Sequence, residues 1–109
     1  MFAEVKGMLP VSGDDYDKEI ALQIKAAALD LTRTAEIILP GEIEISIDAE
    51  TGAVTDESTV EDELIITAIA TWCNMRIGNP PNYDNLLKAY ESMKGNMRIS
   101  GDYTDYGER

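Results

Sequence analysis

The chain has 109 residues, enough for one domain with a single core, and its 21 Asp and Glu against 9 Lys and Arg give a net charge of −12. Such an acidic body repels DNA, whereas ordinary nucleic-acid binding relies on clustered Lys and Arg that neutralise phosphates. With no His and one Cys in the sequence, the usual imidazole base, an internal disulfide and nearly all His or Cys metal sites are excluded.

Two helices are predicted in the first third of the sequence. Residues 2–9 have the periodicity of a short helix, which Pro10 ends. Ser12 or Asp14 is expected to cap a longer second helix. The helix dipole favours anions in the first turn, and the sequence supplies Asp15, Asp17 and Glu19 there.

The second helix carries one apolar stripe with helical spacing. Its buried positions are predicted to be Ile20, Ile24, Ala27, Ala28 and Leu31, with Leu22 and Leu29 widening the stripe. The pattern fades near Ala35, so the helix is expected to end there.

A change of period after residue 42 predicts a β-hairpin around residues 43–55. Ile43, Ile45 and Ile47 alternate with polar residues, as on a strand with one buried face. Turn residues follow at 48–52, where Gly52 can adopt a positive φ. The second strand is therefore expected around residues 53–55.

Residues 64–75 predict a helix that is apolar or small almost all the way round. Such a helix needs cover on several sides, and in so small a domain part of that cover is expected from another subunit. It is too short to span a bilayer, which takes about twenty apolar residues. Cys73 lies in this run and is interpreted as a small buried hydrophobe rather than a nucleophile.

The ends of this apolar helix have their own signals. Ser58 or Thr59 is expected to cap its start, and the acidic residues 61–63 to fill its first turn. Arg76 and Gly78 suit its end.

A last helix is predicted after Pro80 and Pro81, because proline stops one helix and can start the next. Its apolar stripe consists of Tyr83, Leu86, Leu87, Tyr90, Met93 and Met97. The other faces are expected to carry Lys88, Glu91, Lys94 and Arg98. Beyond Ser100 and Gly101, two tyrosines alternate with Asp and Thr, as in a short extended segment.

These patterns together predict a mainly α protein: a small bundle of three main helices plus a short N-terminal helix, with a β-hairpin insertion and an extended C-terminal tail. Residues 1–100 are expected to form the single domain and residues 101–109 the tail. The predicted core comprises Ile24, Leu31, Leu64, Ala68, Ile69, Trp72, Leu86 and Tyr90. No cofactor is predicted, and the calcium-loop fragments at 14–17 and 48–50 lack the spacing or the closing Glu of an EF-hand.

Four stretches carry a resemblance to a known family: the apolar run 64–78, the Pro-Pro-Asn-Tyr-Asp segment 80–84, residues 86–91 with Lys94, and the closing segment 101–107. In these the chain resembles the small head-tail connector (DNA-packaging, head-completion) proteins of tailed bacteriophages. The resemblance is strong over residues 60–107 and looser before them. It lies in a pattern of apolar and aromatic positions.

The resemblance implies a structural protein with no catalytic residues. Such proteins are mostly helical and form a cyclic homo-oligomeric ring beneath the portal protein. They bridge the portal to a tail-side head-completion or stopper protein while genomic DNA passes through the middle without specific binding. The implied location is the virion neck, reached from the host cytoplasm during assembly, with no membrane partner.

An acidic block lies between Arg33 and Arg76, where ten carboxylates occur without a single Lys or Arg. One interpretation is that these residues are helix-start charges and a solvated hairpin. The other is that part of the block, with Glu42, Glu44, Asp48 and Glu50 as candidates, faces the channel of a ring. Repeated round a ring, these like charges would give a negative wall that DNA slides past without sticking.

The C-terminal segment Asp102, Tyr103, Thr104, Asp105 and Tyr106 is the candidate docking arm toward portal or a neighbouring subunit, because Tyr is enriched at interfaces. The alternative is that the tail folds onto its own helix, since Tyr also packs well inside a domain. A rival for the whole chain is a monomeric acidic binding module, such as a DNA-mimic inhibitor that occupies the DNA site of a basic partner.

Overall fold

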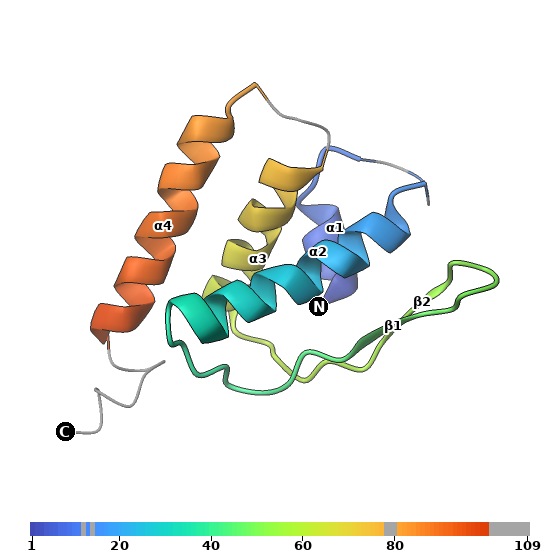
Figure 1. Cartoon of the computed structure of the whole chain (residues 1–109), viewed down its shortest axis with the longest axis horizontal. Helices are drawn as coiled ribbons and strands as arrows, with labels where there is room; N and C mark the ends of the chain where they lie inside the picture. The colour runs from blue at the N-terminus through green and yellow to red at the C-terminus, as the bar shows by residue number, and fades with distance from the viewer. Residues whose placement is uncertain (12, 14, 78–80, 101–109) are drawn as a thin grey trace.

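The computed structural model describes residues 1–11, 13, 15–77 and 81–100 (Figure 1). Helix α2 continues directly into a short π-helix, η1. A two-stranded antiparallel sheet follows η1 in the sequence and precedes the last two helices. The elements are α1 (Phe2–Gly7), α2 (Asp17–Leu29), η1 (Asp30–Thr34), β1 (Ile45–Ile47), β2 (Val54–Asp56), α3 (Glu63–Arg76) and α4 (Tyr83–Ser100). The predicted mainly helical fold with a hairpin insertion is confirmed; the predicted extended tail, 101–109, lies outside the described residues.

Helix α3 lies at the centre of the fold and contacts α1, α2 and α4. Its inward positions Ile65, Ala68, Ile69 and Cys73 have no measurable exposure, as expected for a helix with apolar residues on most of its surface. The exposed side is polar, with Thr67 facing solvent. The cover that this helix needs therefore comes from the chain's own helices, and its burial does not require a second subunit.

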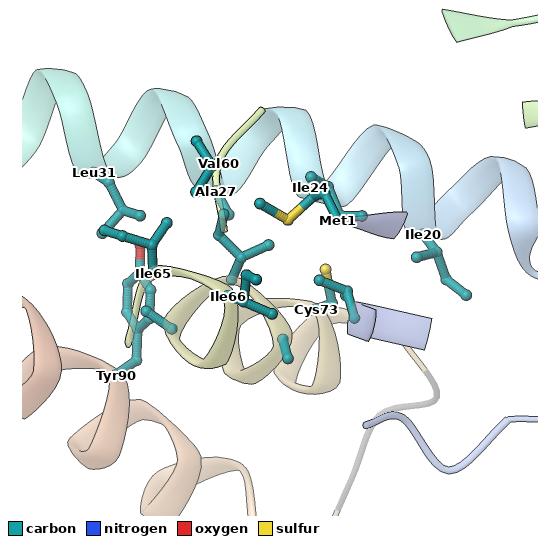
Figure 2. Close-up of a cluster of buried hydrophobic side chains, with 14 of the residues drawn as sticks. Met1, Ile20, Ile24, Ala27, Leu31, Val60, Ile65, Ile66, Cys73 and Tyr90 are labelled. Atoms are coloured by element: carbon teal, nitrogen blue, oxygen red, sulfur yellow. The ribbon is translucent and has the colours of Figure 1, made fainter. Parts of the chain in front are cut away.

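The buried face of α2 agrees with the predicted stripe at Ile20, Ile24, Ala27 and Leu31, and Ala28 is half-buried. Figure 2 shows these side chains directed from α2 toward α3. The prediction that Leu22 and Leu29 widen the stripe is wrong, because their side chains are 44% and 51% exposed. At about 100° per residue, they lie almost opposite the buried face.

Helix α2 begins later than predicted. Its N-cap is Tyr16, which makes no side-chain capping bond. The predicted caps, Ser12 and Asp14, lie outside the described residues. Asp17 and Glu19 do occupy the first turn, whereas Asp15 precedes it. The negative charges of Asp17 and Glu19 interact favourably with the helix dipole.

The hairpin pairs Ile45 with Asp56 and Ile47 with Val54, which confirms the predicted strands to within one or two residues. Ile45 is buried and β1 contacts α2, so the hairpin is anchored on one face. Gly52 has the predicted positive φ of 74°. Figure 1 shows the hairpin at the opposite end of the molecule's longest axis from α4.

The predicted cap of α3 by Ser58 or Thr59 is wrong. The side chain of Asp62 caps the helix by accepting a hydrogen bond of 3.1 Å from the amide of Ile65. The hydroxyls of Ser58 and Thr59 instead accept hydrogen bonds from the amides of Glu44 and Glu42, at 2.9 and 2.8 Å. These bonds extend the pairing of the two chain segments beyond the ends of the strands.

Five of the eight predicted core residues are buried: Ile24, Leu31, Ala68, Ile69 and Tyr90. The other three, Leu64, Trp72 and Leu86, are half-buried and pack against the core. Tyr90 reaches from α4 toward Leu31 and Ile65 (Figure 2). In α4 itself Met97 is buried, whereas Tyr83 and Leu87 are 39% and 38% exposed, so the apolar stripe is narrower than predicted.

Candidate interaction surfaces

The four candidate channel carboxylates, Glu42, Glu44, Asp48 and Glu50, are all exposed on the hairpin or beside it. Their placement on a projecting element agrees with both interpretations of the acidic block, because a solvated hairpin and a channel wall equally require exposure. The structure separates them into two groups, one at the turn and one at the base of the hairpin.

At the turn, Asp48 has a structural task. Its Oδ1 accepts hydrogen bonds from the amides of Glu50 and Thr51, at 2.8 and 3.1 Å. The amide of Gly52 also bonds to the Asp48 carbonyl at 2.9 Å. The hydrogen bonds from the Thr51 and Glu50 amides hold the pKa of Asp48 below its ordinary value. This carboxylate builds the turn that presents Glu50.

At the base of the hairpin, three carboxylates influence one another electrostatically: those of Glu42, Glu44 and Glu57. A hydrogen bond to Glu42, the negative charge of Glu42 and, to a smaller extent, the charge of Glu57 raise the pKa of Glu44. The amide of Glu57 donates to the carbonyl of Glu44 at 2.8 Å, which brings the two segments together. The base of the hairpin is therefore a local concentration of negative charge, as the sequence pattern predicts.

A second cluster joins the start of η1 to α4 and was not predicted. The Tyr90 hydroxyl donates a hydrogen bond of 2.6 Å to Oδ2 of Asp30, and Lys94 Nζ lies 3.1 Å from the same oxygen. Lys94 also pairs with Glu91 at 3.3 Å and lies 4.9 Å from the centre of the Tyr90 ring. The prediction that Lys94 lies on an exposed face is wrong, since only 8% of the residue is exposed.

Aromatic contacts continue this cluster onto α3. The Trp72 and Tyr90 rings are 5.4 Å apart at an interplanar angle of 58°. The Arg76 guanidinium stacks 4.2 Å from the centre of the Trp72 ring, and Trp72 Nε1 donates a hydrogen bond of 3.0 Å to Gln23. A cation over an aromatic face is stabilising at such distances. Trp72 thus links α2, α3 and α4.

The protonation properties of this cluster favour a structural role. Burial raises the pKa of Asp30, but the hydrogen bonds from Tyr90 and Lys94 outweigh it and hold the pKa below its ordinary value. Burial and the bond to Asp30 raise the pKa of Tyr90 well above its ordinary value of 10. A general acid or base works best with a pKa near the ambient pH, and these two groups are shifted away from it. Burial likewise raises the pKa of the Cys73 thiol to about 12, which suits a core residue.

Two further observations concern ligands and membranes. In the ranges 1–11, 13, 15–77 and 81–100, no three His, Cys, Asp or Glu residues gather so that they could hold a metal ion. Over the same residues, the helices are too short or too polar to cross a membrane. The predicted docking arm, residues 102–106, lies outside the described part of the chain.

Comparison of the chain with protein-family models, with curated proteins and with solved structures gave no match.

Proposed function

We propose that this chain is a structural, non-enzymatic subunit of a bacteriophage head-tail connector ring. In this role it docks beneath the portal protein and bridges it to a tail-side head-completion or stopper protein at the virion neck. It assembles in the host cytoplasm, and DNA passes through the ring without specific binding.

The observation that carries the proposal is the pattern over residues 60–107, which resembles that of the connector proteins. The described part of this pattern builds α3 and α4, which contact each other and are joined by the Trp72 and Tyr90 rings. Two aromatic positions of the pattern, Trp72 and Tyr90, thus have a packing role in its described part. Tyr103 and Tyr106 follow α4 in sequence and are the proposed anchors on portal.

The exposed carboxylates support the electrostatic part of the proposal. Glu42, Glu44 and Glu50 are the residues proposed to face the channel, because their side chains are exposed on the hairpin. Asp48 contributes charge too, although its own bonds serve the turn. A wall of like charges lowers the affinity for phosphates, so DNA would slide past it.

Portal binding by the purified protein tests the docking role. Wild type should be retained by immobilised portal protein from the same phage, and the double variant Tyr103→Ala with Tyr106→Ala should bind roughly thirtyfold more weakly. The matched control is Tyr16→Ala with Tyr83→Ala, since these two tyrosines are 45% and 39% exposed. Normal binding by the tail variant, or equal loss in the control, would contradict the proposed anchors.

The rival function, a DNA-mimic inhibitor, is favoured by the same net charge of −12 and by the crowded carboxylates at the hairpin base. A protein of that kind remains monomeric or dimeric and captures a basic host protein. Retention by portal in a multi-subunit complex separates the connector role from this alternative.

A further inference from the structure

The outward face of α2 and η1 has an unusual composition for so acidic a chain. At about 100° per residue, Leu22 and Leu29 lie almost opposite the buried stripe, and both are about half exposed. Exposed basic residues flank them along the same line: Lys18, Lys25 and Arg33. These are three of only nine Lys and Arg in the sequence. We name Lys18, Leu22, Lys25, Leu29 and Arg33 the basic stripe.

The charges of the basic stripe are available to a partner. Lys18, Lys25 and Arg33 form no ion pair with the residues that the structure describes, in contrast to Lys6 and Lys94. A shallow hollow of about 400 Å³ between α1 and the start of α3 is lined by acidic instead of basic residues.

This acidic hollow is lined by Glu4, Met8, Glu61, Glu63, Ile66 and Thr67. Its apolar contribution comes from Met8, which is 52% exposed, and from the edge of Ile66. Glu61 and Glu63 are exposed and have no ion-pair partner among the described residues, whereas Glu4 pairs with the Met1 amino group. The hollow therefore combines exposed apolar surface with two unpaired carboxylates.

We propose that the basic stripe of one copy docks against the acidic hollow of a second copy of this chain. Leucines of the stripe would contact Met8 and Ile66, while Lys18 and Lys25 approach Glu61 and Glu63. Figure 1 shows α1, which forms one wall of the hollow, behind α2. Two different surfaces on one chain give a head-to-tail interface, which closes into a ring when the rotation between copies allows it.

A second copy fits better than an unrelated partner because each surface supplies what the other lacks. Charge complementarity directs association and register, and unlike charges offset the mutual repulsion of two chains that each carry −12. This inference rests on the proposed function, because the interface would build the proposed ring. The interface itself can be tested on the purified chain alone.

The test is a charge swap across the two surfaces, followed by sedimentation equilibrium of the full-length chain. The stripe variant is Lys18→Glu with Lys25→Glu, the hollow variant is Glu61→Lys with Glu63→Lys, and the swap variant carries all four changes. Each single-surface variant should self-associate about tenfold or more weakly than wild type, since like charges then face each other. The swap variant keeps the net charge of −12 and should recover association, as should an equimolar mixture of the two single-surface variants.

Two further variants keep the outcome interpretable if Glu63→Lys weakens the start of α3. Leu22→Ser with Leu29→Ser removes the apolar contact from a solvent-facing surface without a change in charge, and should also weaken association about tenfold. The matched control is Lys88→Glu with Arg98→Glu, which changes the net charge as the stripe variant does at exposed positions of α4. Circular dichroism of every variant confirms that the helices remain.

The proposal is overturned if wild type does not self-associate, if the single-surface variants associate as wild type does, if the swap fails to restore association, or if the control loses as much as the stripe variant. A chain that associates through these surfaces but is not retained by portal contradicts the proposed function alone. Retention in a multi-subunit complex that the stripe and hollow variants leave unchanged contradicts the interface alone.

Discussion

Tyr90 and Asp30 are sixty positions apart in the sequence, and the hydroxyl of the first lies 2.6 Å from a carboxylate oxygen of the second. Asp30 opens the π-helix η1, in which the amide of Ala35 bonds to the Asp30 carbonyl at 3.3 Å. Lys94 approaches the same carboxylate from the next turn of α4. The end of α2 is therefore fixed to the middle of α4 by a polar cluster at the edge of the core.

The first prediction concerns the stability that this cluster provides. Asp30→Asn should lower the free energy of unfolding by about 2 kcal/mol, less than for a fully buried pair because the Asp30 side chain is 19% exposed. Tyr90→Phe should cost about 1–2 kcal/mol. In a double-mutant cycle measured by urea unfolding, the two changes should be non-additive.

Glu91→Gln is the matched control, because Glu91 pairs with Lys94 but its side chain is 56% exposed. It should change the free energy of unfolding by less than about 0.5 kcal/mol. An Asp30→Asn variant as stable as this control would show that the cluster does not hold α2 to α4.

The second prediction concerns acid. The pKa of Asp30 is lowered from its ordinary 3.8, so the unfolded chain binds a proton more readily than the folded chain as the pH falls. The contribution of Asp30 to stability is therefore complete above its ordinary pKa and is lost as the pH falls through the folded-state pKa. Urea midpoints measured from about pH 7 to about pH 2 should fall less steeply below about pH 4 in Asp30→Asn than in wild type. Parallel curves would contradict this assignment.

The third prediction concerns Trp72, which is half-buried but contacts three elements. Trp72→Ala should cost about 2–3 kcal/mol, below the range for a fully buried Trp. Trp72→Phe keeps a ring beside Tyr90 but loses the bond to Gln23 and part of the ring beneath Arg76, so it should cost about 1–2 kcal/mol. If the melting temperatures of both variants lie within a degree or two of that of wild type, Trp72 does not contribute appreciably to stability.

The fourth prediction concerns the acidic block. Glu42→Lys, Glu44→Lys and Glu50→Lys together should leave the helices intact, because all three side chains are exposed. Particles that carry this variant should package and eject DNA more slowly, since Lys binds phosphate. Asp48 is left unchanged because it holds the turn. Normal DNA transit in particles that incorporate the triple variant would show that these carboxylates do not line the channel.

Apolar spacing was sufficient to predict most of the fold. The stripe Ile20, Ile24, Ala27 and Leu31 is buried as its period indicates, and the alternation at Ile45 and Ile47 gives a strand. Both patterns are local, and tertiary packing agrees with them.

Two predictions are wrong because distant partners decide the outcome. Ser58 and Thr59 have the side chains of typical helix caps, but their hydroxyls accept hydrogen bonds from the amides of Glu44 and Glu42, fourteen and seventeen positions earlier. Asp62 caps α3 instead. The charge of Lys94 predicts an exposed position, although Lys94 follows Tyr90 by four positions and so shares its helix face. Only the long-range position of Asp30 explains why a lysine is tolerated there.

For the candidate surfaces, exposure of the hairpin carboxylates could be predicted from their turn and strand-edge positions. The different task of Asp48 depends on backbone amides whose orientation the sequence does not show. The basic stripe could have been found from the spacing of Leu22 and Leu29 relative to Ile20 and Ile24, because helical geometry places them on opposite faces.

Light scattering of the purified protein, alone and with portal, tests the connector role most directly. The expected result is a complex whose mass corresponds to a portal carrying multiple copies of this chain in a cyclic arrangement. A protein that stays monomeric at high concentration with portal present, and that instead forms a one-to-one complex with a basic DNA-binding protein, would contradict the connector role.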